Sequence, residues 1–438
     1  MNSTQPKLEK VIVINDDCVR SGGAAAIALL SAQVLRQLGT EVVFATGDLA
    51  PGEDLASCGV NIVRLGGQHL LDGPRPAAAL RGLYDSGTRR RLAAWIAAHD
   101  TPGTIYHMHN WHKVLSPSIF GALRPVSSRL VLSLHDFFLV CPNGGFFDFK
   151  SGRVCDRTPL SASCLATSCD KRSATHKAWR TVRHLVRRSQ LPVESGSATL
   201  AVVHDGMTAF LDKGGIPRTS VRTILNPVTP WLGARLPAEQ NSGFLYVGRL
   251  ERDKGIHLLA DAVLRTGVTL TAIGDGPLLG ELQAAYPQIR FPGRLPAEDI
   301  AHHASRARAI VVPSLVRETF GLVVLEAAAS GLPVIISDSA LIADEVRAND
   351  MGLVCRAGHL GDLSDALLAL QADDTGASRM SISAFQRARA MITSPDDWGE
   401  TLLALYADVL AQAWSTANSG IVALQNKQAA DGSKVATW

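Results

Sequence analysis

Short apolar runs of strand length alternate with stretches of helical periodicity from the beginning of the chain. Residues 11–15 and 41–45 are such runs, and between them residues 24–38 repeat apolar positions at helical spacing until Gly39 ends the helix. Strands that alternate with helices predict a parallel, doubly wound sheet. The pattern continues through apolar runs at 61–65, 104–108, 130–134, 200–203 and 222–225.

A second array of the same kind runs from residue 244 to about 370, so two α/β domains are expected. Asn226-Pro227-Val228 marks the end of the first. The predicted order is a first domain at 1–228 with an insertion at 141–190, a hinge at 229–242 rich in proline, glycine and polar groups, a second domain at 243–395, a helix at 396–414, and a polar tail at 415–438 that we expect to be disordered.

Length and composition agree with this division. At 438 residues the chain exceeds one ordinary core, and 46% hydrophobic residues with few aromatics suit an α/β protein. A net charge of +3 is too small for a polyanion-binding protein, so nucleic acid is not an expected partner. The start has no apolar core and no run of 18 apolar residues occurs, which predicts a cytoplasmic protein. Seven cysteines indicate reduced thiols.

Candidate chemistry begins with two carboxylates eight residues apart, Glu318 and Glu326, in R-E-T-F-G-L-V-V-L-E-A-A-A-S-G. Thr319 can cap a helix that opens at Phe320 and Gly321, which turns free N–H groups and the positive helix end toward an anion. Gly321 lets that anion approach. One glutamate can then bind a sugar hydroxyl and the other a ribose. The alternative is an amphipathic surface helix with two solvated glutamates.

The flanking residues favour the first interpretation. An apolar strand at 309–313 precedes this helix, and Ser330-Gly331-Leu332-Pro333 ends it before a further strand at 334–337. A strand, an anion-binding helix and another strand form one unit of a nucleotide-binding sheet.

A second motif lies upstream, F-L-Y-V-G-R-L-E-R-D-K-G at 244–255. A strand at 244–247 turns at Gly248, and Gly255 opens the next helix. Arg249 and Lys254 stand between them as cations suited to a diphosphate, Arg as a bidentate fork and Lys as a point charge. A charged surface loop is the alternative.

These two segments resemble glycosyltransferase family 4, a family of retaining GT-B enzymes that use nucleotide sugars. The resemblance is strong over 244–356 and weaker over 10–228. It implies two Rossmann-like domains that face a central cleft, with helix 396–414 crossing back to the first domain. It also implies that Arg249 and Lys254 bind the donor diphosphate, and that Gly274, Arg294 and Leu295 lie around the nucleotide base.

The resemblance extends to strand ends of the first domain. Gly22-Gly23 is the match to a turn near the donor phosphates, and a plain helix-starting turn remains the alternative. His135 ends a strand and is expected to hydrogen-bond the donor sugar. The expected catalytic residues are thus His135, Arg249, Lys254 and Glu318. The other expected donor contacts are Gly22, Gly23, Gly274, Arg294, Leu295, Thr319, Phe320, Gly321, Leu322 and Glu326, with Asp16, His109 and Asn110 on the acceptor side.

No metal or other cofactor is expected, because the chain has no D-x-D triplet of the kind used by metal-dependent GT-A enzymes. His107, His109 and His112 remain an alternative metal cluster, although no carboxylate accompanies them. Cys141, Cys155, Cys164 and Cys169 are either incidental thiols of an insertion or a structural zinc site.

A basic amphipathic helix is predicted at 171–188, where seven cations and no acid occur. Trp179, Val182, Leu185 and Val186 recur at helical spacing. This apolar face either lies on an anionic membrane or packs on the domain.

The resemblance to family 4 implies a retaining glycosyltransferase that moves a sugar from a nucleotide-diphosphate sugar to a glycan or lipid-linked acceptor. Surface polysaccharide, exopolysaccharide or lipopolysaccharide is the expected product, made at the inner face of the cytoplasmic membrane. A GT-B nucleotide-sugar epimerase and a catalytically silent binding protein remain the alternatives.

Overall fold

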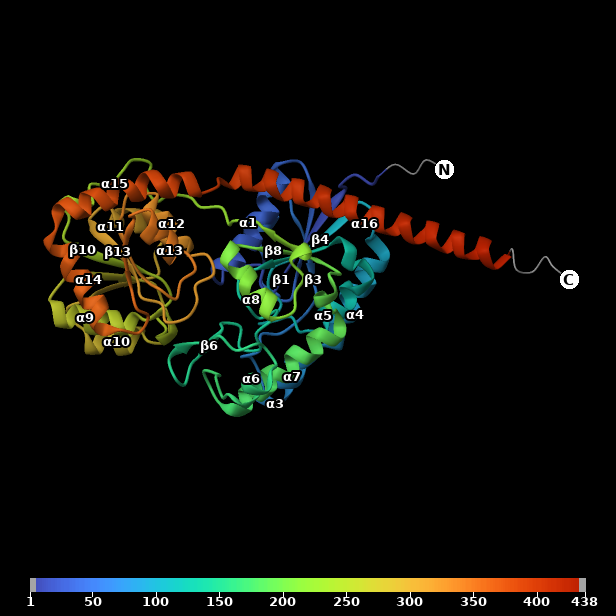
Figure 1. Cartoon of the computed structure of the whole chain (residues 1–438), viewed down its shortest axis with the longest axis horizontal. Helices are drawn as coiled ribbons and strands as arrows, with labels where there is room; N and C mark the ends of the chain where they lie inside the picture. Colours follow the sequence, from blue (N-terminus) through green and yellow to red (C-terminus); the bar gives the residue numbers. More distant parts are fainter. Residues whose placement is uncertain (1–4, 433–438) are drawn as a thin grey trace.

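The structure is a computed structural model that describes residues 5–432, with side chains through residue 419. It contains two parallel-sheet α/β domains joined side by side (Figure 1). Strand order in the first sheet is β3-β2-β1-β4-β5-β8-β9, and in the second β12-β11-β10-β13-β14-β15. Every pairing within these sheets is parallel, which confirms the predicted fold class.

The strands follow the apolar runs of the sequence because helices cover both faces of each sheet, so that successive side chains are all buried. In β1, for example, every residue from Val11 to Asn15 is buried. The first sheet comprises β1 (Lys10–Asn15), β2 (Glu41–Thr46), β3 (Asn61–Arg64), β4 (Thr104–Met108), β5 (Leu130–Leu134), β8 (Thr199–Val202) and β9 (Val221–Thr223). The second comprises β10 (Gly243–Val247), β11 (Leu270–Ile273), β12 (Arg290–Gly293), β13 (Ala307–Val312), β14 (Val334–Ser337) and β15 (Gly352–Cys355).

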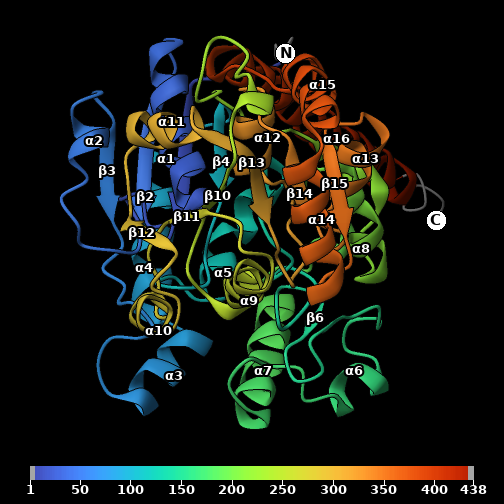
Figure 2. The same cartoon turned by 90° about the vertical axis from the view of Figure 1, so that its left-hand side faces the viewer.

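Helices of the first domain pack around its sheet and extend into the predicted insertion. They are α1 (Gly23–Gln37), α2 (Glu53–Ala56), α3 (Arg75–Leu83), α4 (Ser86–His99), α5 (Ile119–Leu123), α6 (Ala162–Ala166), α7 (Ala174–Gln190) and α8 (Thr208–Lys213). The insertion also holds a small antiparallel hairpin, β6 (Phe147–Asp148) and β7 (Arg153–Val154). Figures 1 and 2 both place α3, α6 and α7 at the same end of this domain.

The second domain carries α9 (Ile256–Thr266), α10 (Leu279–Ala285), α11 (Ala297–Ala304), α12 (Leu322–Ala328), α13 (Ala343–Ala348), α14 (Leu360–Ala372) and α15 (Asp374–Met391). The linker before it, which the sequence predicts as a hinge at 229–242, packs against this domain. The Leu236 amide donates to the Ser330 carbonyl at 3.0 Å, and Leu236 and Ala238 are buried.

Helix α16 (Pro395–Gly432) leaves the second domain and crosses the first (Figure 1). Its apolar residues join one face of the first sheet and α1 in a single core: Trp398, Leu402, Leu405, Tyr406, Val409 and Leu410. The predicted disordered tail is wrong for residues 415–432, which continue this helix, whereas 433–438 lie outside the described residues. Once a helix has formed, each added residue costs little, and Ala, Leu, Gln and Lys are good helix formers.

Of the two arrangements predicted for the basic helix, the structure of α7 does not show the one in which the apolar face packs on the domain. Val182 and Leu185 are exposed, at 46% and 51%, while the basic side chains Arg183 and Arg187 are buried. Arg183 donates to the carbonyls of Gly82, His112 and Leu115, so backbone acceptors compensate the buried guanidinium. The packed face is therefore the basic one, and the apolar residues Val182 and Leu185 partly face solvent. Among residues 5–432, no helix is long and apolar enough to cross a membrane.

Candidate active site

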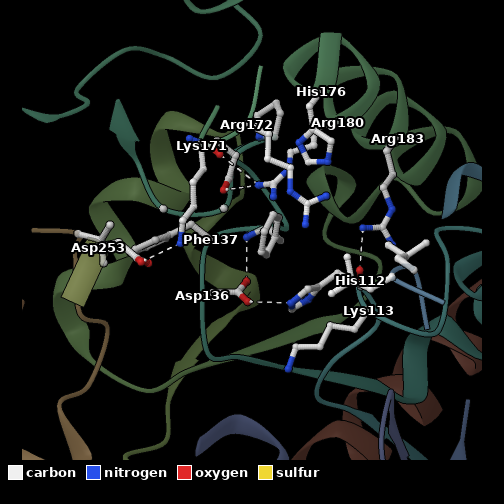
Figure 3. A pocket seen from close by; sticks show the side chains of 18 of the residues that line it. His112, Lys113, Asp136, Phe137, Lys171, Arg172, His176, Arg180, Arg183 and Asp253 are labelled. Atoms are coloured by element: carbon white, nitrogen blue, oxygen red, sulfur yellow. Dashed lines mark hydrogen bonds and ion pairs between the residues drawn. The ribbon is translucent and has the colours of Figure 1, made fainter. Parts of the chain in front are cut away.

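A cavity of about 1570 Å³ lies between the two domains (Figure 3). The loops after β1, β4 and β5 and the start of α7 line it from the first domain, and the loops after β10 and β13 line it from the second. Six expected site residues face this cavity: Gly23, His135, Arg249, Lys254, Glu318 and Thr319. The others do not line it: Gly22, Gly274, Arg294, Leu295, Phe320, Gly321, Leu322, Glu326, Asp16, His109 and Asn110.

The two donor motifs meet in an ion pair. Lys254 Nζ lies 2.6 Å from Glu318 Oε1, and the Ser314 hydroxyl donates to the same oxygen. Burial raises the pKa of Glu318, but the Lys254 ammonium and this hydrogen bonding outweigh it, and the net pKa lies below its ordinary value. Gly255 brings the Lys254 loop against the end of β13, since a Cβ there would lie 1.9 Å from the Pro313 carbonyl oxygen.

Arg249 belongs to a charge network that crosses the cleft. It pairs with Glu251, and Lys171 of the first domain reaches both Glu251, at 3.1 Å, and Asp253, at 2.9 Å. The Arg249 side chain is 60% exposed, so it is open to an incoming anion. Lys171 was not expected at this site, because its partners lie some 80 residues further along the chain.

Helix α12 begins later than the sequence predicts. Its first residue is Leu322, preceded by Gly321 at φ +77°, a conformation that favours glycine. Thr319 does not cap the helix; its hydroxyl donates to the His135 carbonyl oxygen at 2.8 Å and so ties the two domains together. The start of α12 nevertheless faces the start of α1, where a Cβ on Gly23 would lie 3.6 Å from Leu322 Cδ1.

Arg294 also contacts the first domain. Its guanidinium donates to the Arg20 carbonyl at 3.2 Å, next to the Gly22-Gly23 turn.

Glu326 occupies a different environment from Glu318. No ion pair compensates its carboxylate within the described residues, and burial raises its pKa to about 7 despite a hydrogen bond from Trp231 that lowers it. Neither glutamate is a solvated helix-surface residue. They are two half-buried carboxylates, one ionised beside a cation and one titrating near neutrality.

A chain of histidines supports the cavity from the first domain. His109 Nδ1 lies 3.0 Å from His135 Nε2 with the rings stacked, and His107 Nδ1 lies 2.6 Å from the Tyr406 hydroxyl of α16. Burial lowers the pKa of His135 to about 4 and that of His107 to about 3, so both rings are neutral near pH 7. His109 thus lies behind His135 and does not line the cavity.

Asp16 has a structural role here that differs from the acceptor contact expected for it. Its carboxylate accepts the amide N–H groups of residues 112–115, at 2.7 to 2.9 Å. Asn110 is likewise buried, and its amide donates to the Asn15 side chain. These contacts fix the loop that carries His112 and Lys113, both of which line the cavity.

Asp136 is a cavity residue that the sequence analysis did not select. Burial raises its pKa to about 6, and its carboxylate lies 3.8 Å from His112 Nε2. Its only signal in the sequence is its place directly after His135 at the end of β5.

The cysteines of the insertion are free thiols. The buried Lys177 ammonium lies 3.3 Å from the sulfur of Cys169 and 3.7 Å from that of Cys164. In the part of the chain that the structure describes, no group of three or more His, Cys, Asp or Glu side chains is placed to hold a metal ion.

Comparisons with known proteins agree with this geometry. Residues 241–373 match the family model of glycosyl transferases group 1. The glycogen synthase of Mycobacterium tuberculosis (strain ATCC 25618 / H37Rv) is 32% identical over 209 residues, which cover 45% of this chain and 49% of that protein. The chain therefore matches about half the length of this curated relative.

Solved structures match nearly the whole chain. The sucrose-phosphate synthase of Thermosynechococcus elongatus superposes with a TM-score of 0.67 at 18% identity, over 92% of this chain and 99% of that one. Anabaena HepE in complex with UDP-glucose gives 0.62 at 14% identity, over 93% and 99%. The fold is GT-B, and residues 241–373 form a group 1 glycosyltransferase domain.

Proposed function

We propose that this protein is a retaining glycosyltransferase, of the type that family 4 represents, which transfers a sugar from a nucleoside-diphosphate sugar to a glycan or lipid-linked acceptor. The proposal rests on one observation: Arg249, Lys254 and Glu318 meet at the cavity between the two domains of the GT-B fold. The names of the similar proteins, a glycogen synthase and a protein solved with UDP-glucose, support a nucleotide sugar as donor.

The residues suggest how the reaction proceeds. Arg249 and Lys254 stabilise the negative charge that develops on the leaving diphosphate, without a metal ion or other cofactor. Glu318 binds a hydroxyl of the transferred sugar. The neutral His135 ring forms a hydrogen bond with the same sugar near the reacting carbon. The acceptor hydroxyl enters from the first domain, on the face that the diphosphate leaves, so the anomeric configuration is retained.

A donor screen tests this function and its alternatives. The protein is incubated with a panel of nucleotide sugars, and slow hydrolysis of one donor is expected, with the α-anomer as the first product seen by NMR. An epimerase would convert the nucleotide sugar without releasing nucleotide, and a binding protein would do neither. Chelation with EDTA should leave the rate unchanged, whereas loss of activity on chelation would contradict a metal-independent mechanism.

We further propose that the enzyme works at the inner face of the cytoplasmic membrane, in synthesis of surface polysaccharide, exopolysaccharide or lipopolysaccharide. Exposed apolar side chains at the α3, α6 and α7 end support this contact: Leu71, Leu80, Leu165, Val182 and Leu185. Cosedimentation with anionic liposomes is expected to fall when Val182 and Leu185 are both replaced by serine. Equal recovery of variant and parent protein with the vesicles would contradict contact through α7.

A further inference from the structure

The first-domain side of the cavity carries positive charge in addition to the two cations, Arg249 and Lys254, that are assigned to the donor diphosphate. Nine cations line the cavity against four carboxylates, Asp17, Asp136, Asp253 and Glu318. Several of these cations belong to the first domain, on the side opposite the diphosphate grip of Arg249 and Lys254. The cations are Arg75, Lys113, Lys171, Arg172, Arg180, Arg183, Arg249, Lys254 and Arg317.

Part of this charge serves the protein itself. Lys171 pairs with Glu251 and Asp253, Arg180 lies 3.1 Å from Asp170, and Arg183 donates to three backbone carbonyls. Protein groups compensate the charges of these three side chains, so their presence does not by itself indicate a bound anion.

Lys113 and Arg172 differ from them. Among the described residues neither side chain has a hydrogen bond or an ion pair to a protein group, although Lys113 is half-buried. Asp16 holds the Lys113 backbone by its amide, so the loop is fixed while the ammonium stays unpaired. Both side chains line the same cavity (Figure 3).

The start of α7 adds to this potential. Arg172 precedes this 17-residue helix, and Ser173, Thr175 and His176 of its first turn line the cavity. The Ser173 hydroxyl caps this helix by accepting the His176 N–H, and the positive end of the helix dipole favours an anion. Two cations without protein partners and a helix N-terminus thus line the cavity from the first domain, which suits a phosphate or diphosphate group.

An apolar path leads from this side of the cavity to the surface. Trp179 and Ala79 line the cavity where α7 meets α3, and the Trp179 indole donates to the Ala79 carbonyl at 3.0 Å. Leu71 also lines the cavity and is 67% exposed, and Leu80 on α3 is 69% exposed. Residues of α3 and α7 thus line this part of the cavity, and the two helices lie at the same end of the first domain (Figures 1 and 2).

We infer that the acceptor is a sugar joined to a lipid through a phosphate or diphosphate. Lys113, Arg172 and the start of α7 bind the phosphate, and the lipid leaves along Trp179 and Leu71 toward the exposed residues of α3. This inference rests on the proposed function, since it names the class of acceptor that the glycosyltransferase uses. A neutral glycan would leave the half-buried Lys113 ammonium without an ion-pair partner among the described residues.

Calorimetry with three probes tests the inference, with UDP and GDP each added at saturation to occupy the donor site. Farnesyl diphosphate carries both features, farnesol only the lipid and inorganic diphosphate only the charge. We expect farnesyl diphosphate to bind at least tenfold more tightly than either of the others. Equal binding of farnesol would refute the phosphate contact, and equal binding of inorganic diphosphate would refute the lipid path in favour of a soluble phosphorylated acceptor.

Variants assign the subsite. Lys113→Gln combined with Arg172→Gln should weaken farnesyl diphosphate binding at least tenfold, while Arg124→Gln, an exposed first-domain cation outside the cavity, serves as the matched control. Unchanged binding in the double variant would overturn the assignment. A protein that binds these probes but hydrolyses no donor would contradict the proposed function and leave the subsite standing, so the two failures are separable.

Discussion

Replacing Lys254 by alanine should separate the catalytic from the structural part of the Lys254–Glu318 pair. The ammonium and carboxylate lie 2.6 Å apart, and each side chain is 22% exposed, so the pair is only partly screened by water. If Lys254 also stabilises the leaving diphosphate, its loss should cost about 3 kcal/mol of transition-state stabilisation, or on the order of a hundredfold or more in kcat/KM. Arg249→Ala should give a loss of similar size.

The same substitution leaves the Glu318 carboxylate without its cation. We expect a loss of about 1–3 kcal/mol in unfolding free energy, and hence a fall of a few degrees in Tm. Adding Glu318→Gln removes the unpaired charge, so the double variant should recover Tm but not activity. Kinetics on the donor found in the screen and thermal melts would be measured together, with Arg265→Ala as an exposed control on the same domain.

Two results would refute this reasoning. If Lys254→Ala kept its activity within about threefold of the parent, the lysine would not contact the departing group. If adding Glu318→Gln failed to restore Tm, the unpaired Glu318 carboxylate would not be the cause of the lower melting temperature.

Three further predictions concern other parts of the molecule. Glu326→Ala should weaken binding of the nucleoside diphosphate alone, whereas Glu318→Ala should leave that affinity nearly unchanged and cut turnover, as calorimetry beside kinetics would show; equal losses of affinity would contradict the separate roles. Burial raises the pKa of Glu326 to about 7, so its carboxylate gains a proton below pH 7. Nucleotide affinity of the parent protein should therefore fall as the pH drops through 7. This pH dependence should be absent in Glu326→Gln. Tyr406→Phe removes the hydroxyl 2.6 Å from buried His107 and should lower stability by about 1–3 kcal/mol in a denaturant titration, while an unchanged midpoint would show that the hydrogen bond is not stabilising.

Much of the architecture could be predicted from local sequence patterns. Strands buried on both faces appear as continuous apolar runs, so the strands of the first sheet and most of those of the second followed from the sequence. The less buried β15 was not predicted. Lys254 and Glu318 were also predictable, because each lies in a short motif beside a strand end. Their direct contact was not, since it joins residues 64 positions apart.

Long-range contacts account for the errors. The hydrophobic pattern of α7 left open whether Val182 and Leu185 face a membrane or pack on the domain. Carbonyl groups from distant segments, such as that of Leu139 for Arg187, make burial of the basic face possible and leave these two residues exposed. The contacts of Asp16 were likewise not predictable from its own segment, because the four backbone amides that donate to its carboxylate lie almost 100 residues away. In both cases the hydrogen-bond partners are too distant in sequence to appear in the local pattern around the residue.

The crossing of α16 has a consequence for how the chain is made. The core of the first domain includes Trp398, Leu402 and Tyr406, which leave the ribosome only after the whole second domain. At a synthesis rate of about 5–20 residues per second, the apolar face of the first sheet stays uncovered for on the order of ten seconds before α16 emerges. During synthesis the first domain is therefore an incomplete folding unit, whereas the donor domain, being continuous in sequence, can fold before it. We expect nascent chains that stop before Pro395 to need chaperone protection at this face.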